Sequence, residues 1–284
     1  MDIKLERTVK SIGIPPCPNI LVRVIDETNK DEPDYNYLTS IIKTDVALSA
    51  GLIKIANSAY FGANQRARTV REALTIVGLR AATRAIAAVA LRQAFPTSPS
   101  MERFWDASAR IARLSGWLAQ QLNLLGLHPE DAYTFGLFRD CGIPILMISF
   151  SKDYEEALAT ANNETKLSFT SIEDHAFQVN HTIVGSNLAQ NWRLPSEITL
   201  AIKQHHEINM LQLDETRLPH ILLSARLIAL SQLAEHIVQQ QLKLSMTQEW
   251  SKLGTACLQI LNITPDHLKK LYEIAAPIAE AGND

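Results

Sequence analysis

Signals that start and stop helices recur along the whole chain, whereas the alternation of apolar and polar residues that is typical of strands is almost absent. Residues 69–72 form a capping-box pattern, and the apolar face that follows can end at Gly78. The same pattern returns at residues 170–173. Pro129 and Pro265 stand where the first turn of a helix tolerates proline. We therefore predict an all-α fold.

Two further stretches carry helical spacing. Apolar and small side chains between residues 104 and 122 repeat every three or four positions, which places them on one helix face, and this helix is expected to end near Gly126. Residues 218–241 are rich in Leu, Ile and Ala with few charges, enough for about six helical turns. We predict that this second helix is mostly buried. The weakest joints are expected at residues 95–100 and 207–218.

Length and composition exclude several classes of protein. The 284 residues, 46% of them hydrophobic, suffice for one large or two modest domains with a sizeable core, which excludes intrinsic disorder. No stretch approaches the roughly 20 apolar residues of a membrane-spanning helix, and residues 1–10 lack the apolar region of a secretory signal. Cys17, Cys141 and Cys257 are widely spaced, which favours reduced thiols over disulfides. We expect a cytoplasmic protein with no membrane partner.

Charge is unevenly distributed, although the net charge is only −3. Residues 64–113 carry +6, residues 1–63 carry −1 and residues 114–284 carry −8. One interpretation is a binding surface for a phosphate-bearing ligand or an acidic partner. Its centre would be Arg66, Arg68, Arg71, Arg80 and Arg84, with Arg92, Arg110 and Arg113 nearby in sequence. The alternative is that these arginines are solvated helix faces whose aliphatic stems cover the edge of the core.

Several ordered motifs occur between residues 12 and 206. They are a proline motif at 14–18, segments at 41–48, 57–62, 70–80, 105–112 and 132–142, and a closing pattern of His181, Val184, Gly185, Leu188, Trp192, Leu194, Pro195, His205 and His206. Together they resemble the HDOD family, degenerate relatives of the HD-superfamily metal-dependent phosphohydrolases. The resemblance implies a multi-helix HDOD/HD-like fold. Its parts would be an N-terminal helical part at 12–98, an HD-like part at 99–206 and C-terminal helices at 207–284 that complete or extend it.

Four motif residues have structural interpretations of their own. Asp45 is expected to cap the helix that follows it. Asn57 and Gly62 suit a helix end that turns back through a left-handed backbone conformation. Trp192 is expected to be a buried aromatic residue.

The resemblance also identifies positions where an HD phosphohydrolase would bind a divalent cation. Ala107 stands at the position of the first His, Arg139 at that of the second His beside Asp140, and Ser231 at that of the later Asp. A methyl group binds no metal, and a guanidinium carries a permanent positive charge. We therefore expect neither a metal nor another cofactor, and no catalytic residue.

Three histidines remain as candidates for a vestigial pocket with Asp140 and Arg139. These are His181, His205 and His206, for which a structural role, ligand binding and metal ligation are all open. Adjacent residues of a regular helix point about 100° apart, so His205 and His206 are not expected to face one cation. One of the two is expected to pack inward and donate to a backbone carbonyl.

The resemblance implies a bacterial signal-transduction protein that works by binding rather than by catalysis. Its ligand would be a signalling protein met in trans or a nucleotide. The alternative is a metal-dependent phosphohydrolase that acts on a nucleotide or a cyclic dinucleotide. No phosphate-binding glycine loop and no classical nucleic-acid-binding motif occurs, so nucleic acid is not an expected partner. The oligomeric state stays open.

Overall fold

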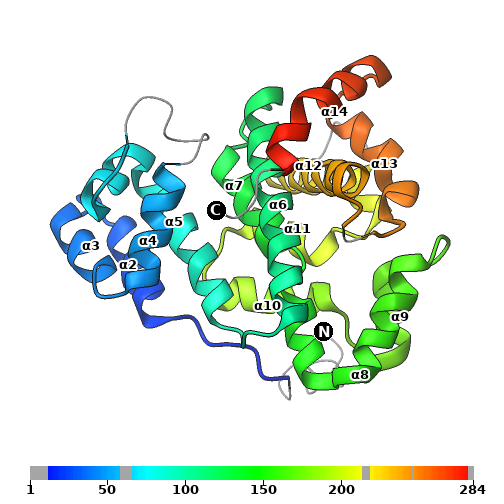
Figure 1. Ribbon diagram of the computed structural model, residues 1–284, viewed down its shortest axis with the longest axis horizontal. Helices are drawn as coiled ribbons and strands as arrows, with labels where there is room; N and C mark the ends of the chain where they lie inside the picture. Colours follow the sequence, from blue (N-terminus) through cyan, green and yellow to red (C-terminus); the bar gives the residue numbers. More distant parts are fainter. Residues whose placement is uncertain (1–11, 58–65, 213–217, 245, 281–284) are drawn as a thin grey trace. The chain divides into compact units, whose positions relative to one another are not determined.

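The computed structural model describes residues 12–57, 66–212, 218–244 and 246–280. The chain divides into two compact units, one formed by Pro16–Thr97 and the other by Ser98–Asp284 together with residues up to Pro15. Within the described residues every regular element is a helix, as the sequence predicts (Figure 1). The division after Thr97 lies next to the expected start of the HD-like part at residue 99, and the expected limits of the other parts stay a prediction.

The smaller unit consists of α2 (Asn19–Thr28), α3 (Tyr35–Ile42), α4 (Val46–Ala56) and α5 (Val70–Gln93). The predicted start of α5 is confirmed, because Thr69 Oγ1 accepts from the backbone N–H of Glu72 at 3.2 Å. Gly78, with φ 76°, interrupts the helical backbone between two segments of α5. The predicted stop is thus a break, after which the chain continues as a helix.

Helix α4 begins as expected and ends differently. Asp45 Oδ1 accepts from the backbone N–H of Leu48 at 2.9 Å, which confirms the cap. Asn57 has φ −92°, so the expected left-handed conformation is wrong for this residue. Its side chain instead exchanges two hydrogen bonds with the backbone of Ala67, at 2.7 and 2.8 Å. Gly62 lies outside the described residues.

The larger unit contains the remaining helices. They are α6 (Pro99–Leu122), α7 (Pro129–Phe138), α8 (Gly142–Asn163), α9 (Phe169–Phe177), α10 (His181–Asn191), α11 (Ser196–Gln204), the 3₁₀ helix η1 (Ile208–Leu211), α12 (Pro219–Leu242), α13 (Glu249–Ile260) and α14 (Pro265–Glu280). The starts at Pro129 and Pro265 are confirmed, and α6 ends shortly before Gly126. Trp192 is fully buried, and its Nε1–H donates to the backbone carbonyl of Pro15.

Helix α12 forms the centre of this unit. It packs against α6, α7, α11, α13 and α14, and most of its side chains are buried, as its sequence predicts. Both α12 and α5 are long and apolar enough to cross a membrane by length and composition, which the sequence interpretation did not anticipate. The same property is typical of a buried core helix. The cytoplasmic location therefore stays a prediction.

The second capping-box pattern does not start a helix at its own position. Ser168 caps α9, because its Oγ accepts from the backbone N–H of Ser171 at 3.2 Å, and the helix begins at Phe169. Glu173, which the pattern would use at the cap, is fully buried inside the unit. The capping pattern therefore predicted a role for Glu173 at the helix end, whereas the side chain is part of the interior of the unit.

A close backbone contact joins the start of α8 to the start of α10. A Cβ atom added at Gly142 would lie 2.0 Å from the backbone carbonyl oxygen of His181 and 2.9 Å from the backbone nitrogen of Gly185. Only glycine permits this approach. The contact places the turn before α8, which contains Asp140, beside His181, the first residue of α10.

Candidate functional site

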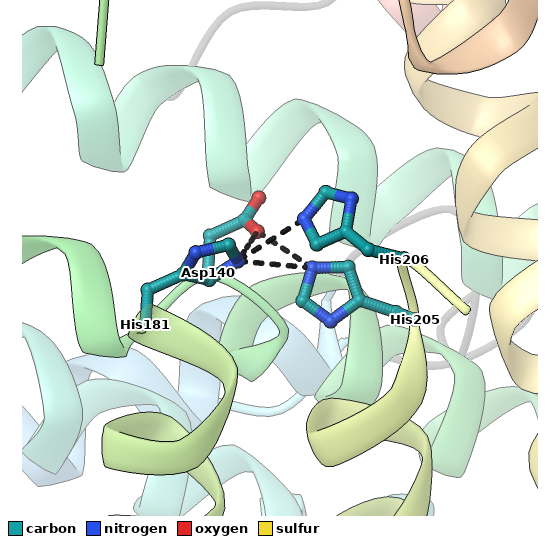
Figure 2. Close-up of side chains that lie close together, drawn as sticks. All are labelled: Asp140, His181, His205 and His206. Carbon is teal, nitrogen blue, oxygen red and sulfur yellow. Dashed lines mark hydrogen bonds and ion pairs between the residues drawn. The ribbon is translucent and has the colours of Figure 1, made fainter. Parts of the chain in front are cut away.

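Four polar side chains from three separate places in the larger unit converge on one point (Figure 2). Asp140 lies in the turn between α7 and α8, and His181 is the first residue of α10. His205 caps the end of α11, and His206 follows it. One ligand atom from each side chain lies within 4.8 Å of the other three.

His205 and His206 both contribute to this point, so the expectation that they diverge is wrong. Helix α11 ends at Gln204, and His206 lies beyond it, where the angular spacing of a regular helix does not apply. Their ring centroids are 4.1 Å apart and their planes are tilted by 42°. His205 also shows the expected backbone contact, because its Nδ1 lies 2.9 Å from the carbonyl oxygen of Ile202.

The point is enclosed by protein. His181 is 0%, His205 1% and His206 8% exposed. The side chain of Asp140 is 19% exposed and is the most accessible of the four. The ring of Phe169 stacks on His206 with a centroid distance of 5.1 Å. Water therefore reaches this site mainly past Asp140.

Each of two histidines has a buried carboxylate behind it. His181 Nδ1 lies 2.7 Å from Glu173 Oε2, and the same carboxylate accepts from the backbone N–H of His181 and from the hydroxyl of Tyr154. His206 Nδ1 lies 2.5 Å from Glu249 Oε2, whose other oxygen pairs with Lys252 at 2.6 Å. Outer carboxylates of this kind fix the orientation and the tautomer of an imidazole.

The sequence interpretation missed both Glu173 and Glu249. Glu173 was read as a helix-capping residue, and a mid-chain acid eight residues before a histidine has no distinguishing pattern. Glu249 lies 43 residues after its partner His206. No local signal could have paired them.

Burial and the carboxylates act on the histidines in opposite directions. Burial lowers the pKa of His206 to about 3, and it also lowers the pKa of His205. Burial disfavours the charged form of His181 as well, but the charge and hydrogen bond of Glu173 outweigh it and raise the pKa. For Glu249, burial raises the pKa, but the contacts with His206 and Lys252 lower it to about 2.

The other side of Asp140 is occupied by a buried arginine. Arg139 Nε lies 2.9 Å from Asp140 Oδ2, and one terminal nitrogen lies 2.8 Å from Glu235 Oε1. The other terminal nitrogen donates to Ser231 Oγ at 3.3 Å. Burial raises the pKa of Asp140, but Arg139 and the nearby histidines hold it well below its usual value. The Asp140 carboxylate is therefore held between a fixed cation and the three imidazoles.

Three of the residues that the resemblance places at HD-type ligand positions do not fit a metal ion. Arg139 places a positive charge at one of them, Ala107 offers only a buried methyl group, and Ser231 accepts from the guanidinium. No hydrolytic step can be assigned to a cation at those positions. The three histidines that face Asp140 are not among these positions.

The arginine-rich stretch is only partly assembled into a common surface. Arg66 and Arg71 line a cavity of about 430 Å³ with Glu72, Thr75 and Ile76 in the smaller unit. Of the five central arginines, the other three lie outside this set: Arg68 and Arg80 are exposed, and Arg84 is half-buried. In the larger unit, Arg110 pairs with Asp106 at 2.9 Å. The predicted binding surface stays a prediction.

Comparison with known proteins gives a family match. The HDOD domain family matches residues 14–208. An uncharacterized protein of Treponema pallidum (strain Nichols) is 28% identical over 199 residues, which cover 69% of this chain. The match spans only 38% of that relative's length.

Two crystal structures share the fold at low sequence identity. A protein of Shewanella amazonensis SB2B, named "Putative phosphohydrolase", is 18% identical with a TM-score of 0.71, and the match covers 98% of this chain and 96% of that one. An HDOD domain protein with unknown function from Geobacter sulfurreducens is 20% identical with a TM-score of 0.64, and the match covers 98% of each chain. These likenesses establish the helical architecture.

Proposed function

The chain belongs to the HDOD domain family, and on that premise we propose that it is a non-catalytic signal-transduction module that acts by binding a partner protein or a nucleotide. One observation carries the proposal. Arg139, 4% exposed and paired with both Asp140 and Glu235, places a permanent charge where the HD-type hydrolytic centre would need a metal ligand. Such a centre needs a divalent cation to activate water and to offset the phosphate charge.

The enclosure of the polar site supports the same conclusion. The three histidines are at most 8% exposed, so the face of Asp140 that meets them is largely covered by protein. Ligand binding would then use an outer surface. The cavity beside Arg66 and Arg71 falls within the roughly 300–1,000 Å³ of small-molecule sites and offers two guanidinium groups for phosphate. A signalling protein with an acidic face would suit the same two side chains.

The alternative function is a metal-dependent phosphohydrolase, and the convergence of Asp140 with three histidines favours it. Histidine and carboxylate ligands are common in catalytic metal sites. That function would require a coordination position open to substrate. The burial of the cluster argues against such a position.

A combined assay tests the proposal. The full chain is incubated with nucleotides, cyclic dinucleotides and bis(p-nitrophenyl) phosphate in the presence of Mn²⁺ or Fe²⁺, and product release and melting temperature are measured on the same samples. We expect no more product than with the Asp140→Asn variant, because the charge of Arg139 excludes a hydrolytic cation.

Melting temperatures in the same samples separate the two kinds of ligand. A nucleotide that binds only the folded chain raises its melting temperature, and Arg71→Glu should abolish that rise. No rise with any nucleotide would favour a protein partner. Metal-dependent product release that Asp140→Asn abolishes, in a variant that still melts cooperatively, would contradict the non-catalytic function.

A further inference from the structure

The hydrogen bonds behind the three histidines determine where their lone pairs point. Glu173 Oε2, Glu249 Oε2 and the Ile202 carbonyl oxygen can each only accept a hydrogen bond at these contacts. Each Nδ1 must therefore carry a hydrogen. A neutral imidazole that is protonated at Nδ1 has a lone pair at Nε2. All three Nε2 atoms are thus acceptors when the three rings are neutral.

These three acceptors face one another and a carboxylate oxygen (Figure 2). His181 Nε2 lies 3.3 Å from His205 Nε2 and 3.1 Å from His206 Nε2. Asp140 Oδ1 lies 3.2 Å from His205 Nε2 and 3.7 Å from His181 Nε2. Lone pairs held this close in a buried site repel one another, so a positively charged species between them is needed to stabilise the arrangement.

The distances match the edges of a coordination tetrahedron. Bonds of 2.0–2.1 Å from a zinc-like ion to nitrogen or oxygen place neighbouring ligand atoms about 3.3–3.4 Å apart. Four of the six separations, from 3.1 to 3.7 Å, lie around this value, and the other two are at most 4.8 Å. The donor set of three imidazoles and one carboxylate suits divalent transition metals, whereas Mg²⁺ and Ca²⁺ require mostly oxygen ligands.

We propose that Asp140, His181, His205 and His206 bind one divalent transition-metal ion of the Zn²⁺ or Fe²⁺ type in a closed, non-catalytic site. Four protein ligands fill a tetrahedral shell and leave no position for substrate water, which is the character of structural zinc sites. The ion would join the turn before α8, the start of α10 and the end of α11. This replaces the sequence-based expectation of no metal, which rested on the HD-type positions, and it takes up the metal ligation that was left open for the three histidines.

Glu173 and Glu249 complete the site from outside. Each accepts from the Nδ1–H of a ligating histidine and is buried, at 0% and 3% exposure. Carboxylates in this position raise the basicity of the ligand and fix its ring. The inference goes beyond the proposed function, because a closed site contributes cohesion and metal-dependent order to the larger unit without chemistry.

The test uses the untagged full chain, stripped of metal with a chelator and then titrated with Zn²⁺ and, separately, Co²⁺. Calorimetry, metal analysis after gel filtration and thermal melting are the measurements. We expect about one ion per chain and a higher melting temperature, because the ion binds the folded chain. Bound Co²⁺ should show the visible absorption of tetrahedral coordination.

Variants assign the ion to these residues. His181→Gln and His206→Gln each remove a ligand and should weaken Zn²⁺ binding by more than the roughly 10- to 100-fold expected when an outer partner is lost. Glu249→Gln, which keeps all four ligands, should weaken it by roughly 10- to 100-fold and keeps the test valid if the histidine variants fail to fold. His236→Gln changes a half-buried histidine of α12 outside the cluster, and it should leave Zn²⁺ affinity unchanged.

The inference is overturned if the full chain binds far less than one ion, or if the ligand variants bind Zn²⁺ as tightly as the native chain. A proton shared among the imidazoles would then occupy the point. The outcome is separable from that of the hydrolysis assay. Zn²⁺ binding with hydrolysis that Asp140→Asn abolishes would overturn the proposed function and the closed, non-catalytic character of the site, but not the binding of the ion. Neither binding nor hydrolysis would overturn only this inference.

Discussion

The two oxygens of Asp140 face regions of opposite character. Oδ2 lies against Arg139, whose remaining nitrogens contact Glu235 and Ser231, so the charges on this side are paired within the protein. Oδ1 lies against the Nε2 atoms of His181 and His205, which have no counter-ion of their own on this side when both rings are neutral. One side is complete without a ligand, and the other is not.

This difference separates two roles around the same carboxylate. A guanidinium supplies charge permanently and cannot exchange with a cation from solution. Imidazoles with fixed tautomers supply lone pairs and leave the charge to a bound species. The HD-type positions therefore serve structure, whereas the histidine side retains the capacity to bind.

The largest expected effect comes from removing the cation on the arginine side. Arg139→Leu leaves the buried carboxylates of Asp140 and Glu235 without their partner, which should lower the free energy of unfolding by roughly 3–5 kcal/mol. Urea unfolding measures it. Arg103→Ala, a change at an exposed arginine of α6, should alter this free energy by no more than about 0.5 kcal/mol.

A loss below about 1 kcal/mol for Arg139→Leu would contradict the view that this side is locked by ion pairs. If the variant does not fold at all, Arg139→Lys serves in its place. Lysine keeps the charge but cannot bridge two carboxylates and a hydroxyl with a planar fork. It should therefore show an intermediate loss.

A smaller effect is expected where the backbone places His181 against the turn that carries Asp140. Gly142→Ala puts a Cβ atom against the carbonyl oxygen of His181, so the starts of α8 and α10 must separate. Overpacking of this kind costs roughly 1–3 kcal/mol of unfolding free energy. Gly13→Ala, where no heavy atom lies within 4 Å of the new Cβ, is the matched control. Equal unfolding midpoints for the two variants would show that the histidine side does not depend on this contact.

The smallest expected effect is the pH dependence of stability that comes from His236, a histidine of the larger unit outside the cluster. His236 stacks on Trp250, with ring centroids 4.4 Å apart, and burial lowers its pKa from 6.5 to about 4. The unfolded chain therefore binds more protons between these two values. The contribution of His236 to stability is fully present above about pH 6.5 and is lost as the pH falls toward 4.

Denaturant unfolding of the native chain and of His236→Gln at pH 7 and pH 4.5 measures this contribution. The native chain should lose about 1 kcal/mol more than the variant over this interval, a value reduced for the partial exposure of the ring. Equal losses in both chains would show that His236 does not titrate in this range, and the acid sensitivity of the unit would then have to come from other groups.

Local features of the fold were predictable because their signals lie within a few residues of one another. The cap at Thr69 and the start at Pro129 each depend on hydrogen bonds or backbone angles inside one helical turn. The buried helix α12 was predictable from composition, because a helix that is apolar over a wide arc must be covered. The cap read at residues 170–173 was wrong because Ser168, two residues earlier, offers the same chemistry.

The sequence by itself determined the helical architecture and the presence of candidate histidines. Only the tertiary structure decided that His205 and His206 turn to the same point and that Glu173 and Glu249 stand behind the cluster. The physical reason is the separation of the interacting residues along the chain. A helix signal acts over one turn, whereas the histidine cluster depends on where three helix ends meet and on a hydrogen-bond acceptor 43 residues away.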